Sequence, residues 1–267
     1  MAEQALRVGI IGCMGRMGQA VAAVVVAADG LVLAGGTDRA GNPGMKIPGT
    51  DAPVMMDLAG LLEISDVVID FSAPGSTADH AEAAAAVGTA LVVGTTGLTA
   101  SDHAALDAAG KSTAIVQAGN FSLGVNLLMA LTEEAARVLG DDWDIDILEM
   151  HHRHKVDAPS GTALMLGEAA AKGRGVDLGT VACKARDGVI GERPVGEIGF
   201  ATLRGGAVIG EHEVIFASDS ERLILSHKAE NRSLFAKGAV VAARFAATVP
   251  AGRYTMQDVL KLQLGSR

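Results

Sequence analysis

The feature that most constrains the fold is the alternation, through the first half of the chain, of short β-branched runs with alanine-rich stretches. The runs predict buried strands, and the stretches between them have the composition of helices. This alternation is typical of βαβ crossovers, which build a mostly parallel sheet with helices on its faces. We therefore predict an α/β domain with strands at Leu6–Ile11, Leu31–Ala34, Val67–Phe71, Leu91–Val93 and Ala114–Gln117, and helices at Arg16–Ala28, Thr77–Val87 and Ser101–Ala109.

A glycine-rich loop joins the first predicted strand to the first predicted helix. Gly12, Gly15 and Gly18 leave backbone N–H groups at the helix start unobstructed by Cβ atoms, so a pyrophosphate can approach them. Met14 stands where the common dinucleotide fingerprint has its second glycine. The loop alone is therefore also compatible with an ordinary tight turn between a strand and a helix.

An acidic residue after the second strand supports the dinucleotide interpretation. Asp38 lies 20 residues after Gly18, where a carboxylate would accept hydrogen bonds from the adenosine ribose. Arg39 beside it could pair with a ribose 2′-phosphate. With the glycine loop, these residues predict a Rossmann-type dinucleotide-binding domain that tolerates both NADH and NADPH.

Two further loops fall at predicted strand ends: Gly94-Thr95-Thr96-Gly97 and Ala118-Gly119-Asn120-Phe121. In an open α/β sheet, ligands lie outside the carboxyl ends of the strands. We expect these loops to contact the nicotinamide half of the cofactor, with ordinary turn chemistry as the alternative.

The pattern changes from Trp143 onward, where Trp143, Ile145 and Ile147 alternate with Asp144 and Asp146. Period-two alternation predicts a strand with one buried and one solvated face. Later runs are similar, so we predict a second, open sheet. Its further strands are predicted at Gly199–Leu203, Val208–Phe216 and Leu223–His227. Helices are predicted at Ser233–Ala247 and Met256–Leu262, and the last helix is expected to return to the first domain. The least regular stretch is Lys172–Arg193.

The charge balance limits the partners of the chain. Lys and Arg number 22 against 31 Asp and Glu, which leaves a net charge of -9. A field of that sign repels nucleic acid and anionic membrane surfaces. An anionic substrate must therefore be held by a local basic cluster.

Such a cluster lies in the run from Glu149 to Thr162. His151, His152, Arg153, His154 and Lys155 can all carry positive charge, and Ser160, Gly161 and Thr162 at a helix start add N–H donors. One carboxylate on the helix start and another on the lysine would suit a dicarboxylate. A histidine nearby could supply a proton at neutral pH.

Other interpretations of the histidines remain open at this point. Zinc could bind His151, His152 and His154, although the interleaved Arg153 and Lys155 would repel the ion. The run could also be a solvated basic loop, or the anion site of a non-catalytic nucleotide sensor. Asp157 and Glu149 are expected to orient basic side chains.

The two cysteines, Cys13 and Cys183, have no metal-type spacing and indicate neither a disulfide framework nor a zinc knuckle. Neither has the context of a thiol nucleophile, so a semialdehyde-type dehydrogenase is not favoured. The first residues show no signal-peptide pattern, and the apolar run Ala20–Ala28 is too short to span a bilayer. We expect a soluble, cytoplasmic protein.

The run from His151 to Ala163, HHRHKVDAPSGTA, resembles the signature of the 4-hydroxy-tetrahydrodipicolinate reductase (dihydrodipicolinate reductase) family. The resemblance extends over essentially the whole chain. Its other motifs are Gly12 through Gly18, Asp70-Phe71, Gly94 through Gly97, Asn120-Phe121-Ser122, Gly124-Val125-Asn126, Gly210-Glu211-His212 and His227-Lys228-Ala229.

The resemblance implies NAD(P)H-dependent reduction of (hydroxy-)dihydrodipicolinate, a small cyclic dicarboxylate, in diaminopimelate and lysine biosynthesis. It implies a dinucleotide-binding domain over residues 1–122 and 233–267. Residues 123–232 would form a smaller α+β domain with an open mixed sheet, which binds substrate and assembles a homotetramer.

The resemblance also implies roles for residues. His151 would be the proton donor and Lys155 essential, while the substrate would be held by Lys155, His152, Ser160, Gly161, Thr162 and Arg232. The cofactor candidates are Gly12, Cys13, Met14, Gly15, Arg16, Met17, Gly18, Asp38, Arg39, Phe71, Gly94, Thr95, Thr96, Gly97, Ala118, Gly119, Asn120 and Phe121. No metal is implied.

Overall fold

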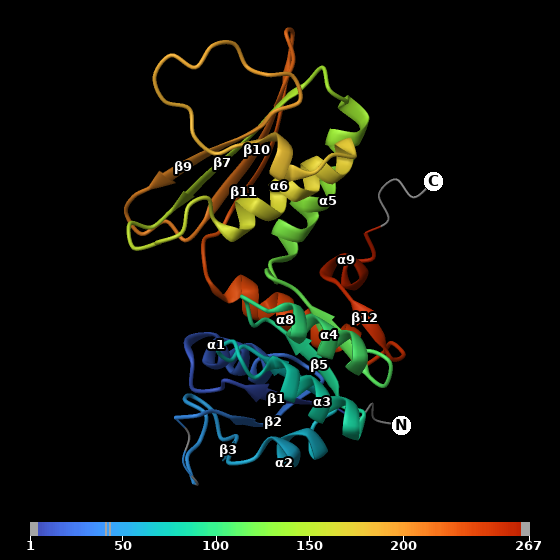
Figure 1. The fold of residues 1–267 in the computed structure, drawn as a ribbon. Coiled ribbons are helices and arrows are strands. Elements are labelled where there is room, and N and C mark those ends of the chain that lie inside the picture. The colour runs from blue at the N-terminus through green and yellow to red at the C-terminus, as the bar shows by residue number, and fades with distance from the viewer. Residues whose placement is uncertain (1–4, 41, 43, 263–267) are drawn as a thin grey trace. The chain divides into compact units, whose positions relative to one another are not determined.

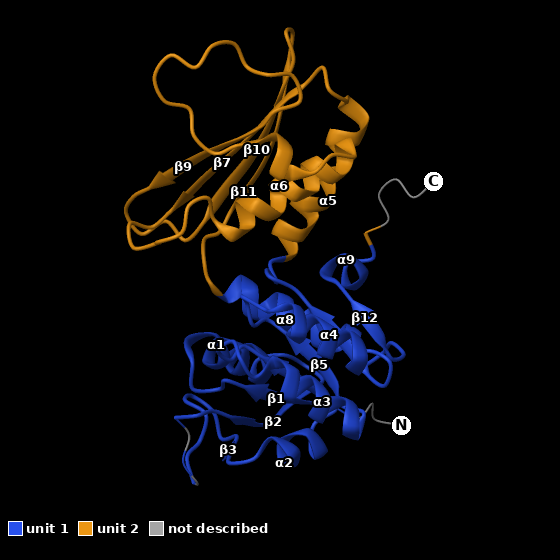
Figure 2. Ribbon diagram, in the orientation of Figure 1, with its two compact units in different colours: residues 1–122, 233–261 blue, residues 123–232, 262–267 orange. Residues whose placement is uncertain are grey.

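The structure is a computed structural model that describes residues 5–40, 42 and 44–262. Its contacts divide the chain into two compact units (Figure 2). Of the described residues, those within 5–122 and 233–261 form unit 1, and residues 123–232 with Leu262 form unit 2. The predicted end of the first domain at residue 267 lies outside the described residues.

The described part of unit 1 forms a seven-stranded sheet in the order β12-β6-β5-β4-β1-β2-β3, and all its neighbouring strands are parallel (Figure 1). The α/β class predicted from the sequence is thus confirmed. The strands are β1 Leu6–Ile11, β2 Leu31–Thr37, β3 Val54–Met55, β4 Val67–Asp70, β5 Ala90–Val93, β6 Ala114–Gln117 and β12 Gly252–Tyr254, and the helices are α1 Arg16–Val26, α2 Leu58–Glu63, α3 Thr77–Val87, α4 Ala100–Ala109, α8 Ser233–Ala246 and α9 Met256–Val259.

Each face of this sheet carries its own hydrophobic core. One core joins β-strand residues such as Val8 and Ile69 to α1 and α8, and the other joins Ile11 and Val68 to α2, α3 and α4. Central strands buried on both faces explain why their sequences are continuous apolar runs rather than alternating ones. The carboxyl ends of β1, β2 and β4 consequently lie along one edge, where the glycine loop begins.

The described part of unit 2 forms a five-stranded mixed sheet in the order β11-β10-β7-β9-β8 (Figure 1). Helices α5 and α6 cover one face, where they share a core with the strands. The bounds are α5 Leu123–Leu139, β7 Asp144–His151, α6 Gly161–Arg174, α7 Leu178–Val181, β8 Ala182–Cys183, β9 Ile198–Arg204, β10 Glu211–Ala217 and β11 Arg222–Lys228.

The alternation in β7 decides which side chains reach the helix-covered face. Ile145, Ile147, Glu149 and His151 are buried, while Asp144 at the start of the strand is exposed. The predicted one-sided burial is therefore confirmed. The same period carries two ionisable residues, Glu149 and His151, into the protein interior at the carboxyl end of the strand.

Several elements differ from the sequence expectation. Helix α5 was missed, as were the short elements α2, β3 and β12. Lys172–Arg193 is more regular than predicted, because α6 continues to Arg174 and α7 and β8 follow; the segment without helix or strand runs from 184 to 197. That segment is fixed by ion pairs from Arg186 and Arg193 to Asp146. None of the described helices is long and apolar enough to cross a membrane.

Candidate active site

The glycine loop of unit 1 has the backbone geometry that requires glycine. Gly12 has a φ of +79°, and a Cβ at Gly18 would lie 2.1 Å from the Gly12 carbonyl oxygen. The Gly15 N–H donates to that same oxygen at 3.1 Å, which closes the turn. The start of α1 can approach β1 this closely only without side chains, which is the arrangement a pyrophosphate cradle needs.

Asp38 and Arg39 lie beside this loop. The Asp38 carboxylate accepts the Met14 N–H at 3.0 Å and the Ala40 N–H at 2.9 Å. These residues border a cavity of about 240 Å³, lined by Ile11, Gly12, Gly15, Thr37, Asp38, Arg39, Phe71, Ser72, Ala73, Ser76 and His80. The structure therefore brings together the predicted cofactor residues Gly12, Gly15, Asp38, Arg39 and Phe71.

Other predicted cofactor residues use their side chains for packing. Phe121 is buried and meets Phe71 edge-on, with ring centroids 5.8 Å apart. The Thr95 hydroxyl donates to the Ser72 carbonyl at 3.1 Å, and a Cβ at Gly94 would collide with the Phe71 ring. The side chains of Thr95 and Phe121 are thus buried and engaged within unit 1.

Cys13 is fully buried, so its thiol is not exposed to a ligand at the loop. Burial, with the nearby charge of Asp38 as a smaller cause, raises the pKa of the Cys13 thiol to about 11. A thiol protonated at neutral pH is a poor nucleophile. This argues against the semialdehyde-type alternative at Cys13.

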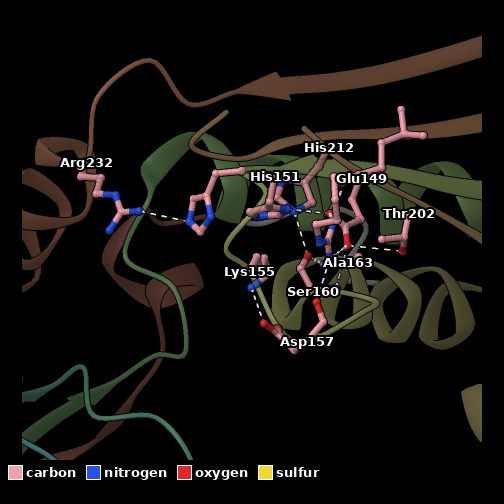
Figure 3. A network of polar contacts seen from close by, with 12 residues as sticks. Glu149, His151, Lys155, Asp157, Ser160, Ala163, Thr202, His212 and Arg232 are labelled. Atoms are coloured by element: carbon pink, nitrogen blue, oxygen red, sulfur yellow. Dashed lines mark hydrogen bonds and ion pairs between the residues drawn. The ribbon is translucent and has the colours of Figure 1, made fainter. Parts of the chain in front are cut away.

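The central feature of unit 2 is a buried carboxylate, Glu149, surrounded by donors (Figure 3). Its Oε2 lies 2.6 Å from His151 Nδ1, and the Ser160 N–H donates to Oε1 at 3.0 Å. The Arg204 guanidinium binds both carboxylate oxygens at 2.8 Å. Burial alone would raise the pKa of Glu149, but hydrogen bonds from Arg204, His151 and Ser160 together outweigh it and hold the pKa below its usual range.

The imidazole of His151 is held through its Nδ1, which contacts the Glu149 carboxylate. Burial lowers its pKa below the ordinary value, the Glu149 carboxylate opposes this, and the charges of Lys155 and Arg204 lower it further. The ring is therefore mainly neutral at pH 7 in this state, whereas the proton-donor role requires the imidazolium. A Cβ at Gly210 would lie 3.0 Å from His151 Nε2, so glycine at this position leaves that nitrogen room.

A second imidazole, His212, packs edge-on against His151 with ring centroids 5.1 Å apart. His212 Nε2 lies 3.1 Å from the Ser160 hydroxyl, which also caps α6 by accepting the Ala163 N–H. Burial, with the neighbouring His151 as a smaller cause, lowers the pKa of His212 to about 4. His212 is accordingly neutral at pH 7 and ties the start of α6 to the sheet.

The other predicted substrate residues lie around this network in unit 2. The Lys155 ammonium pairs with Asp157 at 2.9 Å, and Arg232 lies 3.3 Å from His152 Nε2. Figure 3 labels Lys155, Asp157 and Arg232 together with the residues of the Glu149 network. Gly161 is the first residue of α6, and Thr162 follows it. Among the described residues, no group of three or more His, Cys, Asp or Glu is arranged to hold a metal ion.

Arg204 is the site residue that the sequence reasoning missed. Its strand pairs in parallel with β7, so that Arg204 stands opposite His151 although 53 positions separate them. It also donates to the Asp157 carbonyl at 2.7 Å and so links the lysine loop to Glu149. This role depends on the strand pairing, and the one signal in the sequence is that Arg204 directly follows the predicted strand Gly199–Leu203.

Comparison with known proteins identifies the family. Family models described as dihydrodipicolinate reductase match at the N-terminus over residues 6–121 and at the C-terminus over residues 124–260. The chain belongs to the dihydrodipicolinate reductase family. The resemblance stated from the sequence is thereby confirmed.

Curated relatives of this reductase family match over almost their whole length. The 4-hydroxy-tetrahydrodipicolinate reductase of Rhizobium rhizogenes is 50% identical, covering 98% of this chain and 99% of the relative. That of Methylocella silvestris is 51% identical, covering 96% and 97%. A dipicolinate-bound dihydrodipicolinate reductase from Paenisporosarcina sp. TG-14 has a TM-score of 0.78 at 24% identity, covering 95% of this chain and 98% of that one, and supports the fold.

The depressed pKa of His212 predicts a pH-dependent stability. Because the unfolded chain binds a proton at an ordinary histidine pKa near 6.5 and the folded chain does so only at about 4, the free energy of unfolding should fall as the pH drops between these values. The contribution of His212 is about 3 kcal/mol over that window. Urea unfolding at a series of pH values measures it.

The variant His212→Gln should lose this part of the pH dependence, because glutamine cannot take up the proton. His103→Gln, at an exposed histidine of α4, is the matched control and should keep it. An unchanged slope in His212→Gln would contradict the assignment of the low pKa to His212.

Proposed function

We propose that this chain catalyses the NAD(P)H-dependent reduction of (hydroxy-)dihydrodipicolinate to tetrahydrodipicolinate in diaminopimelate and lysine biosynthesis. The observation that carries this proposal is the buried pair of His151 and Glu149, balanced by Arg204 and bordered by Lys155 and the start of α6. The family membership of the chain and the glycine loop of unit 1 support it.

The cofactor would be held by unit 1. Gly12 and Gly15 offer a backbone surface without Cβ atoms, Asp38 suits the ribose hydroxyls, and Arg39 lines the same cavity. These donors and acceptors fit a dinucleotide. When bound, the nicotinamide would supply the hydride, which would add to C4 of the conjugated cyclic imine left after the hydroxy substrate loses water.

The substrate would be held by unit 2 through its two carboxylates. The Lys155 ammonium now pairs with Asp157, whose side chain is about half exposed, so a substrate carboxylate can compete for it. The N-terminus of the 14-residue helix α6, at Gly161 and Thr162, offers N–H donors to the other carboxylate. Arg232 and His152 would add positive charge near the substrate.

His151 would deliver the proton from Nε2 to the carbon next to the hydride acceptor. Its Nδ1 is committed to Glu149, so the proton that can be transferred sits on the opposite nitrogen. The pKa of His151 is low in the free protein, but a doubly anionic substrate nearby favours the imidazolium. Substrate binding would thus help to charge the acid that the reaction uses.

Replacing Lys155 tests the substrate role directly. Lys155→Ala should lower kcat/KM by about 100-fold or more, because it removes the cation that orients a carboxylate, while the affinity for NADH stays nearly unchanged. Turnover is measured as the loss of reduced-cofactor absorbance after addition of freshly made substrate. A non-catalytic nucleotide sensor would give no such loss in the wild type.

Lys184→Ala, at an exposed lysine of the 184–197 segment, is the matched control and should behave as the wild type. Unchanged turnover in Lys155→Ala would remove Lys155 from the chemistry.

The Glu149→Gln variant tests the proton donor. Because the Glu149 carboxylate raises the pKa of His151, its removal should lower that pKa, reduce kcat at neutral pH by about 100-fold and move the optimum to lower pH. The pH profile of kcat is the measurement. Thr202→Val, which removes only a 3.4 Å contact to the same carboxylate, should keep the wild-type profile. If Glu149→Gln and the wild type had the same pH profile of kcat, Glu149 would not be the residue that tunes the proton donor.

We further propose a homotetramer assembled through the face of the unit 2 sheet that α5 and α6 leave uncovered. The register puts Ile224 beside Ile215 on that face, and Leu203 of β9 beside Met150. Ile224 and Leu203 are about half exposed, which is unusual for large apolar residues in a sheet and typical of an interface.

The oligomeric state follows from mass measurements in solution. Light scattering should give about four times the chain mass of 27.1 kDa. Ile224→Asp should lower this mass by introducing a charge into the interface, whereas Val138→Asp, at an exposed valine of α5, should not. A monomeric wild type, or a tetramer unaffected by Ile224→Asp, would contradict the proposed interface.

The proposed compartment is the cytoplasm. Both cysteines are free thiols, Cys13 in the interior and Cys183 partly exposed, which is consistent with a reducing environment.

A further inference from the structure

The cavity beside the glycine loop contains a histidine for which the proposed function has no use. His80 belongs to the first turns of α3 and lines the cavity together with Asp38, Arg39 and Ser76. Its side chain is 14% exposed, so it is neither a surface histidine nor a core one. His80 is therefore placed where its imidazole can contact a ligand in this cavity.

The ring of His80 is fixed by a carboxylate behind it. His80 Nδ1 lies 2.8 Å from Asp70 Oδ2, and Asp70 is fully buried at the end of β4. The other Asp70 oxygen accepts the Ser72 N–H at 2.8 Å, so the carboxylate itself is anchored. With Nδ1 committed to Asp70, Nε2 is the nitrogen left to face the cavity.

Ser76 connects His80 to Arg39. Ser76 is the N-cap residue of α3, yet its side chain makes no capping hydrogen bond with the helix. Its hydroxyl instead accepts from the Arg39 guanidinium at 3.2 Å. The His80 N–H donates to the Ser76 carbonyl at 3.0 Å, so the two side chains stand one helical turn apart on the same face. Arg39, Ser76 and His80 thus form one polar group beside Asp38.

The charges in the cavity show what this group can do. Asp38 is held in place by two backbone N–H groups and suits the hydroxyls of a ribose, but it would repel a phosphate on that ribose. Arg39 alone only offsets Asp38, whereas a phosphate monoester brings a charge of about -1.5 to -2. A second side chain beside Arg39 would therefore strengthen phosphate binding. His80 lines the same cavity, and its ring is anchored through Nδ1 by the buried Asp70, so that Nε2 can meet the phosphate.

We infer that His80 is a specificity-determining residue, whose Nε2 binds the ribose 2′-phosphate that distinguishes NADPH from NADH. This inference rests on the proposed function, since it assumes that the cavity holds the adenosine end of the cofactor. Asp70 acts as a positioning residue that aims the ring, and Ser76 holds the Arg39 guanidinium on the same side.

The test measures binding of two small probes to the full chain by calorimetry. Adenosine 2′,5′-bisphosphate carries the 2′-phosphate, and 5′-AMP is the same molecule without it. His80→Asn puts an amide nitrogen near the position of Nδ1, so it can keep the contact to Asp70 while removing Nε2. We expect His80→Asn to weaken binding of the bisphosphate by about 10-fold and to leave 5′-AMP binding unchanged. NADPH and NADH should follow the same pattern.

Two further variants keep the test decisive if His80→Asn folds poorly. His80→Gln extends an amide toward the position of Nε2 and should retain part of the discrimination. Ser76→Ala should weaken bisphosphate binding a few-fold through Arg39, with little effect on α3 because the hydroxyl makes no cap bond. His103→Asn, at an exposed histidine of α4, is the matched control and should bind both probes as the wild type does.

Equal weakening of both probes in His80→Asn, or no weakening of either, would overturn the inference. Neither result bears on turnover by the wild-type chain with NADH, which tests the proposed function separately. A wild-type chain that binds neither probe nor NADH would instead overturn the cofactor site itself, and the inference with it.

Discussion

The substrate side of this protein depends on one buried interaction, the pairing of Glu149 with Arg204 and His151. A carboxylate in the interior is costly unless charge and hydrogen bonds compensate it. Here the guanidinium compensates the charge and the Ser160 N–H adds a further bond, so the carboxylate stays ionised where it can hold an imidazole. Removing one partner would leave the others buried without compensation, which couples the stability of the site to its chemistry.

The same interaction links three parts of unit 2 that are distant in the sequence. His151 ends β7, Ser160 starts α6, and Arg204 ends β9. Arg204 also reaches the carbonyl of Asp157, the residue whose side chain pairs with Lys155. The lysine loop, the helix start and the acid are therefore held by one set of contacts. This explains how a local concentration of positive charge persists in a chain with a net charge of -9.

Much of this could be predicted from the sequence because it depends on local patterns. Strands buried on both faces are apolar runs, which is why β1 was predicted correctly. The glycine spacing indicates a turn in which the backbone segments pack too closely to leave room for a Cβ atom, so the loop after β1 was predicted as well. Period-two alternation likewise gave the buried face of β7. Helix α5 was not predicted, because its first turn carries Gly124, Val125 and Asn126, residue types with low helix propensity.

What could not be predicted depends on contacts between distant segments. Arg204 meets Glu149 only through the parallel pairing of β9 with β7, and His80 meets Asp70 only because α3 folds back over the end of β4. Burial lowers the pKa values of His151 and His212, and the burial of a histidine cannot be inferred from the residue type alone. Such features depend on the three-dimensional fold, since hydrophobic periodicity carries no information on which strands become neighbours.

The division of the chain has a consequence for biosynthesis on the ribosome. The helices and strands described for unit 2 all lie in the continuous segment 123–232. The core of unit 1, in contrast, needs α8, whose Ala236, Ala239 and Ala243 pack against β-strands made more than a hundred residues earlier. During translation from the N-terminus, the nascent nucleotide domain therefore exposes part of an apolar sheet face until α8 emerges. The inserted domain can complete its own core first, so synthesis order and folding order are reversed between the two.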